Sequence, residues 1–201
     1  MEISKEMVSM EIGCQESMKE GTDKNERQDT TLESPSLYPT FFHARDDDFT
    51  TQTWRIKSEV QAGHVFGGHY LRINGSKVSA DAARNDSKAQ FKIHCYYDDR
   101  LDRDLWIFES ASDGKFIAIE NDRIVVKSVQ TSLTSIVHVK ATNPEILFVK
   151  KPLSPGSTVF TLRLYSSSTT KYYLGFDNVN GSAMIPSKVR PTTKEAKFRI
   201  V

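Results

Sequence analysis

Cysteine is scarce in this chain, and long apolar runs are missing. Only Cys14 and Cys95 occur among 201 residues, which excludes the disulfide framework of small secreted domains. No apolar run approaches the ~18–20 residues that span a bilayer, so we expect no membrane insertion. The first twenty residues carry Glu2 and Glu6 and no sustained apolar stretch, so no secretory signal peptide is predicted. We therefore expect free thiols in a reducing compartment, with Cys95 a plain strand thiol.

The net charge of +1 hides two regions of opposite sign. Residues 1–52 hold 12 acidic and 5 basic residues, a net of −7, whereas residues 53–201 hold 14 acidic and 22 basic residues, a net of +8. The first region is also rich in Ser, Thr and Glu and poor in strong core formers, so it cannot offset the entropy of ordering. We predict an acidic, disordered pro-segment over residues 1–52 and a folded domain over residues 53–201.

The second region shows a pattern of strands and tight turns. Short runs rich in Val, Ile, Phe and Tyr are separated by dipeptides that favour turns: Asn74-Gly75, Asp113-Gly114, Pro155-Gly156 and Asn180-Gly181. Asn-Gly and Asp-Gly tolerate the positive φ of tight hairpins. No stretch has a convincing helical period. An all-β domain is therefore predicted.

Three segments of this region resemble one another. Tyr70–Ile73, Phe116–Ile119 and Tyr173–Phe176 are each followed by a turn, an apolar strand and then a second strand. The apolar strands lie around Val78, Ile124–Val126 and Met184-Ile185, and the second strands are Phe91–Ile93, Leu147–Val149 and Phe198–Ile200. Both Phe91 to Ile117 and Phe148 to Leu174 span 26 residues. Repeats of this period indicate units that cannot bury their cores alone.

Three all-strand units of about 50 residues fit a closed barrel with threefold pseudosymmetry, because closure removes exposed sheet edges. Strand alternation directs one face of each repeat toward a shared core, through Leu71 and Ile73, Ile117 and Ile119, and Leu174 and Phe176. We predict a β-trefoil of 12 strands. A propeller fits less well, since each blade needs four strands.

Credible catalytic or metal-ligating spacing is missing. The five histidines are scattered, and only His64 and His69 are close, with no Cys or carboxylate nearby in the sequence. Phe66-Gly67-Gly68 lacks the Lys-Ser/Thr pair of a phosphate-binding loop. We expect no enzymatic activity, no cofactor, no metal and no nucleic-acid partner.

The opening strands resemble those of the interleukin-1 family, including its receptor antagonist, through Trp54–Ile56, Tyr70–Arg72 and Lys77–Ala80. The family signature of the third repeat is matched in spacing by Leu164, Ser166, Ser167, Thr170, Tyr173, Leu174, Gly175, Phe176 and Met184. Four identities depart from it: Leu164, Thr170 in place of Pro, Gly175, and Phe176 in place of Thr. The resemblance covers about three quarters of the chain.

Fibroblast growth factors are the alternative trefoil family. Lys188–Pro191, before Lys197-Phe198, looks like their basic C-terminal strand, and a heparin-type glycan site could form from Lys188, Arg190, Lys194, Lys197 and Arg199. However, Asn143–Ile146 lacks their central Cys, and the segment from Val126 to Ile146 is longer than theirs. A third reading is an intracellular scaffold module, which usually comes in several copies.

The interleukin-1 resemblance implies a cytoplasmic precursor that leaves the cell without a signal peptide and is trimmed before its trefoil. Asp46, Asp47 and Asp48 lie just before the first predicted strand and form a candidate site for an Asp-specific inflammatory caspase. The alternative to a processing site is a solvated acidic linker. The resemblance further implies a monomeric cytokine that modulates immune signalling by binding an immunoglobulin-type receptor ectodomain.

One position bears on the sign of signalling. Agonist members often have Asp just before the Phe of the last strand, whereas the receptor antagonist has Lys, and this chain has Lys197 before Phe198. A positive charge there could oppose recruitment of a second receptor chain, because like charges placed together cost several kcal/mol. The resemblance therefore implies antagonist-like signalling; the alternative is a generic exposed lysine at the strand end.

Overall fold

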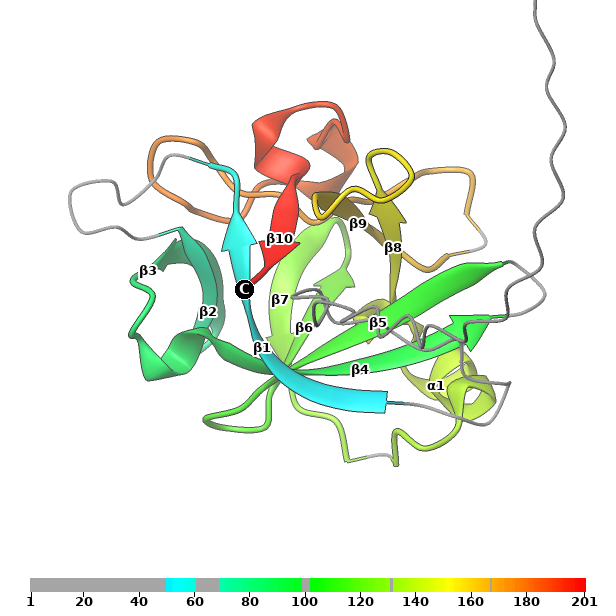
Figure 1. Ribbon diagram of the computed structural model, residues 1–201. Coiled ribbons are helices and arrows are strands. Elements are labelled where there is room, and N and C mark those ends of the chain that lie inside the picture. The colour runs from blue at the N-terminus through cyan, green and yellow to red at the C-terminus, as the bar shows by residue number, and fades with distance from the viewer. Residues whose placement is uncertain (1–49, 61–68, 99–101, 131, 167) are drawn as a thin grey trace, which may run out of the picture. The chain divides into compact units, whose positions relative to one another are not determined.

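The computed structural model divides the chain into two units, residues 1–41 and residues 42–201. It describes residues 50–60, 69–98, 102–130, 132–166 and 168–201, all within the second unit (Figure 1). Of these described residues, 46% are in strands and 14% in helices. The predicted all-β class is therefore confirmed. The predicted disordered segment lies outside the described residues, except that the first strand already begins at Thr50.

Six antiparallel strands form a closed ring. Its members, in ring order, are β1 (Thr50–Ser58), β4 (Gln90–Asp98), β5 (Arg103–Ser110), β8 (Phe148–Pro152), β9 (Phe160–Leu164) and β10 (Phe198–Ile200). The ring closes where β10 pairs with β1, with Ile56 opposite Ile200. These two strands come from opposite ends of the domain and lie side by side (Figure 1). Closure leaves neither strand as a free edge.

Two of the three predicted hairpins form continuous ladders, the first with a register shift between Tyr70 and Arg72. β2 (Tyr70–Asn74) pairs with β3 (Lys77–Ala82), and β6 (Phe116–Glu120) pairs with β7 (Arg123–Lys127). Their turns use positive φ at Gly75 in the first and at Asn121 and Asp122 in the second, as the turn chemistry predicted.

The third hairpin is irregular. Phe176 bridges Ala183, the amide of Met184 donates to the carbonyl of Gly175, and Gly181 supplies the positive φ of the turn. Isolated bridges replace a continuous ladder. The amide of Tyr173 donates across the hairpin to the carbonyl of Pro186, but proline has no amide hydrogen to return the bond. The described residues therefore contain ten named strands where 12 were predicted.

The interior of the barrel is aromatic. Trp106 packs edge-on against Phe108 and Phe160, with ring centroids 6.0 Å and 5.3 Å away. Phe198 packs against Phe160 at 6.4 Å and Phe176 at 6.1 Å. The six residues predicted to face the core are all buried: Leu71, Ile73, Ile117, Ile119, Leu174 and Phe176. Cys95 is a buried free thiol in β4, as predicted, and burial raises its pKa to about 12.

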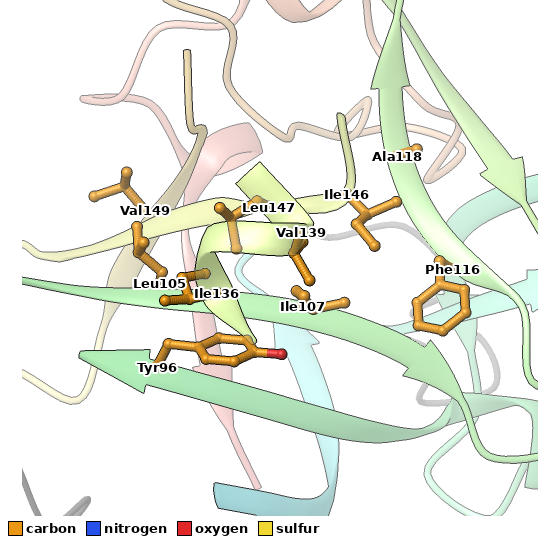
Figure 2. Packing of buried hydrophobic residues seen from close by; sticks show 10 residues of the cluster. All are labelled: Tyr96, Leu105, Ile107, Phe116, Ala118, Ile136, Val139, Ile146, Leu147 and Val149. Carbon is orange, nitrogen blue, oxygen red and sulfur yellow. The ribbon is translucent and has the colours of Figure 1, made fainter. Parts of the chain in front are cut away.

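A second apolar cluster lies beside the barrel and includes an unpredicted helix, α1 (Ile136–Thr142). Figure 2 shows Ile136 and Val139 reaching from α1 toward Leu105 and Ile107 of β5. The cluster also buries Phe116 and Ala118, so both faces of β6 are covered and its burial does not alternate. The other helices among the described residues are single 3₁₀ turns: Ser87–Ala89 (η2), Pro144–Ile146 (η3), Pro186–Lys188 (η4) and Lys194–Ala196 (η5).

Candidate functional site

The residues that carry the family signature mostly support packing. Leu174 is buried and its amide donates to Leu162, while Tyr173 bridges Arg163 of β9. A Cβ on Gly175 would lie 2.7 Å from both methyl carbons of Val189, so only glycine fits without a shift. Met184 is half-buried. The small residue in the signature is thus required by close packing.

The other signature residues lie toward solvent. Ser166 is exposed, and its hydroxyl accepts a hydrogen bond from the amide of Ser168 at 3.0 Å. Ser167 lies outside the described residues, as do the candidate processing residues Asp46, Asp47 and Asp48. The family signature therefore begins in an exposed loop at Ser166 and ends in a packed strand at Leu174 and Gly175.

Lys197 is anchored by its backbone at the point where the ring closes. It directly follows η5, and its carbonyl accepts a hydrogen bond from the amide of Glu59 at 3.0 Å. Its half-buried side chain forms no ion pair with any residue that the structure describes. The neighbouring Arg199, by contrast, pairs with Glu59 at 2.6 Å. The ammonium of Lys197 thus remains available to a partner.

The other basic residues predicted near the C-terminus are solvent-exposed. Lys188, Arg190 and Lys194 come from η4, the connection after it and η5. Arg199 is also exposed but is partly neutralised by its pairing with Glu59. These exposed basic residues are spread over several segments, and together we call them the basic C-terminal face.

Sequence reasoning missed a basic groove on another part of the barrel. Two hollows, of about 350 and 700 Å³, share Arg103 and Arg163 in their walls. They lie where the start of β5 meets β8 and β9 and residues 164–166, 171 and 173. We call the two together the β5–β9 groove. Its cations come from positions far apart in the chain, so no basic run marks it.

The β5–β9 groove contains more positive than negative charge. Six cations line it (Arg103, Lys140, Lys150, Lys151, Arg163 and Lys171), against three carboxylates (Asp102, Asp104 and Glu145). Lys150 lies 4.6 Å above the Trp106 ring and 3.8 Å from Asp104, and burial lowers its pKa. Lys140 pairs with Asp98 at 2.6 Å and lies over the Tyr165 ring.

A separate, partly buried polar chain runs across three neighbouring strands of the barrel. Nδ1 of His94 lies 2.8 Å from the Thr51 hydroxyl, and Nε2 lies 2.8 Å from Glu109. Because a carboxylate only accepts, neutral His94 donates from Nε2 and accepts at Nδ1. Burial lowers the pKa of His94, although Glu109 partly opposes this. Burial alone would raise the pKa of Glu109, but hydrogen bonds from Lys92 and His94 outweigh it and lower that pKa. The chain ties β1 to β5 through β4.

The described residues bring no three His, Cys, Asp or Glu side chains together in a way that could hold a metal ion. His64, of the histidine pair noted in the sequence, lies outside them. Within the same residues, no helix combines the length and apolar character that crossing a membrane requires. The sequence matches no protein-family model and no curated protein, so the case for a function rests on the residues themselves.

Proposed function

We propose that this chain is a β-trefoil cytokine of the interleukin-1 type that acts by binding an immunoglobulin-like receptor ectodomain. The main observation that supports this proposal is the order of elements in the closed ring. Each of the pairs β1 and β4, β5 and β8, and β9 and β10 has one hairpin inserted between its members. The unit of strand, hairpin, strand therefore occurs three times.

The filled interior of the barrel supports the outer surface as the part of the molecule that binds a partner. The barrel interior is filled by large aromatic side chains, which leaves no room for a ligand in the middle of the ring. In small barrels of this kind, function is carried by the outer surface and loops. On this proposal the protein is a binding module without enzymatic activity, and its monomer is the active species.

The direct test is capture of the full chain by immobilised ectodomains of the interleukin-1 receptor family. Saturable binding to at least one ectodomain, with no binding to unrelated immunoglobulin-type ectodomains, is expected. The proposal is wrong if no member of the receptor family captures a chain that unfolds cooperatively. Capture by fibroblast growth factor receptors instead would favour the alternative trefoil family, for which the exposed Lys188, Arg190 and Lys194 are the supporting observation.

Antagonist-like signalling is the second part of the proposal, and Lys197 is its determinant. Because Lys197 makes no ion pair within the described part of the chain, no described carboxylate offsets its charge, which would oppose a positively charged surface of a recruited subunit. In receptor-positive reporter cells, Lys197→Asp is expected to gain recruitment of the second chain while binding of the first receptor stays unchanged. Lys194→Asp is the matched control on the same exposed face. Equal behaviour of wild type and both variants would contradict the assignment.

Release of the active domain is the third part. We propose a cytoplasmic precursor that is cleaved by a caspase among Asp46, Asp47 and Asp48 and leaves the cell without a signal peptide. Cleavage there would fall just before Thr50, where β1 begins, so the ring would stay complete. N-terminal sequencing of the released protein is expected to give a start between residues 47 and 49. A start inside β1, or far upstream, would exclude this route.

A further inference from the structure

We propose that the β5–β9 groove is a binding site for a linear sulfated glycan, distinct from the basic C-terminal face. The proposal begins from charge that the protein leaves uncompensated. Arg103, Lys151, Arg163 and Lys171 line the groove, and none of them forms an ion pair or a side-chain hydrogen bond with any residue that the structure describes.

The carboxylates near the groove are already engaged. Asp98 pairs with Lys140, Asp104 with Lys150, and Glu145 with Lys127, and Asp102 accepts a hydrogen bond from the hydroxyl of Tyr97. Tyr97 is neutral, so Asp102 keeps its charge, and the four unpaired cations outnumber this one unpaired carboxylate in the hollow. A cleft lined by one sign of charge focuses its field and attracts a ligand of the opposite sign.

The residue types fit sulfate groups. Arg103 and Arg163 border both hollows, and a guanidinium can donate two parallel hydrogen bonds to one oxyanion. Lys151 and Lys171 add single charges on flexible stems. All four cations line the same hollow, and the two arginines also border the second one. Several separate cations around one concave surface can contact several anionic groups, so they suit a chain of repeated sulfates better than a single anion.

The aromatic residues favour a glycan over a nucleic acid. Tyr97 and Tyr173 line one hollow and Tyr165 the other, and their rings offer amphipathic contact area. Base recognition in single strands needs open aromatic faces on which to stack. The ammonium of Lys140 lies 5.1 Å from the centroid of Tyr165, and the hydroxyl of Tyr97 is tied to Asp102. One face of the Tyr165 ring is thus already covered, and the Tyr97 ring is held in place through its hydroxyl.

The test compares two sets of substitutions in the full chain, with heparin oligosaccharide as the probe. The groove variant carries Arg103→Gln, Arg163→Gln and Lys171→Gln. The matched control removes the same number of charges from the C-terminal face through Lys188→Gln, Arg190→Gln and Lys194→Gln. All six side chains lie outside the apolar core and form no ion pair among the described residues, so both variants should keep the thermal transition of the wild type.

We expect the groove variant to bind heparin at least ~10-fold more weakly, which corresponds to about half a kcal/mol for each of three exposed contacts. Its affinity should also depend less on salt, because fewer counterions are released. The control should change affinity less than ~3-fold. Heparin stripped of its sulfates should not bind the wild type.

Four outcomes overturn the proposal: no heparin binding by the wild type, loss of binding in the control variant only, equal binding of desulfated heparin, or tighter binding of a single-stranded oligonucleotide of equal charge. Receptor capture, measured in parallel, keeps the two proposals separate. A groove variant that no longer binds heparin but still binds its receptor supports both the glycan site and the receptor-binding function. If the wild type binds heparin through the groove but no receptor captures it, the receptor proposal is wrong and the glycan site is still supported.

Discussion

His94 and Glu109 make the stability of the barrel sensitive to acid. The folded pKa of His94 lies below its ordinary value of 6.5, mainly because of burial, so the unfolded chain binds a proton more readily at this site. Stability from this site is therefore complete above pH 6.5 and falls as the pH drops toward the lowered folded pKa. Glu109 has a lowered pKa too, and its contribution is lost at still lower pH, beginning near 4.5.

We expect the free energy of unfolding, measured with denaturant, to be smaller at pH 5.5 than at pH 7.5. His94→Gln should reduce this difference, since glutamine can occupy the site but does not titrate. His138→Gln is the control, because His138 is exposed. A pH dependence that is identical in wild type and His94→Gln would show that other groups carry it.

Replacement of Gly175 should destabilise the protein for a steric reason alone. Alanine would place its Cβ 2.7 Å from the Val189 methyl carbons, and overpacking of this kind costs about 1–3 kcal/mol. Gly175→Ala should lower the free energy of unfolding by that amount. Combining it with Val189→Ala should cost less than the sum of the two single changes, because the second change removes the clash. Additive costs would mean that the clash is relieved elsewhere.

At the scale of elements, α1 is a short helix that is stabilised by what it covers. Its seven residues are too few for a stable isolated helix, but Ile136 and Val139 are buried in the cluster beside the barrel. Val139 is fully buried, whereas Val137 in the same helix is 73% exposed. The pair separates burial from helix propensity, since both positions carry the same side chain.

Val139→Ala should destabilise the protein by about 1–3 kcal/mol through lost burial and an unfilled cavity. Val137→Ala should be neutral or slightly stabilising, because alanine is the better helix former. Chemical denaturation of both variants checks this. Similar losses in the two would mean that α1 contributes by its propensity and not by packing.

The β2–β3 and β6–β7 hairpins could be predicted from the sequence because their signals are local. Asn74-Gly75 and the turn at Asn121 supply the positive φ that the structure uses, and the flanking apolar strands appear where expected. Helix α1 could not be predicted, since seven residues hold too little periodicity to detect. The irregularity of the third hairpin escaped prediction, because it depends on the register that places Pro186, which has no amide hydrogen, opposite Tyr173.

The groove shows a different limit of sequence reading. Lys150 and Lys151 are adjacent, but Arg103, Arg163 and Lys171 join them only after the ring has formed. A cluster assembled from distant segments leaves no motif in the sequence. The predicted candidates Leu174 and Tyr173 could be found because a family pattern marks them, and in the structure their part is packing and strand pairing.

At the scale of the whole molecule, β10 is the strand that completes the ring. Phe198 is fully buried and contacts both Phe160 and Phe176. A chain ending at Lys197 would lose this side chain and leave β1 and β9 as open edges. Truncating one buried Phe side chain alone costs about 3–5 kcal/mol, a large part of a typical domain's stability of about 5–15 kcal/mol.

Deletion of residues 198–201 is therefore expected to abolish the cooperative thermal transition and to expose apolar surface to a hydrophobic dye. Arg199→Ala is the control, because that side chain is exposed and its salt bridge with Glu59 is a surface one. It should keep the transition within a few degrees of the wild type. A sharp transition in the shortened chain would mean that five strands suffice.

The pairing of Ile56 with Ile200 also limits when the barrel can close during biosynthesis. The strand that begins the domain finds its last neighbour only when residues 198–200 have emerged from the ribosome, so the barrel cannot close before that point of translation. Contacts between such distant segments slow folding. The nascent protein must therefore remain soluble with its aromatic interior incomplete, and cellular chaperones have their main opportunity to bind it during that interval.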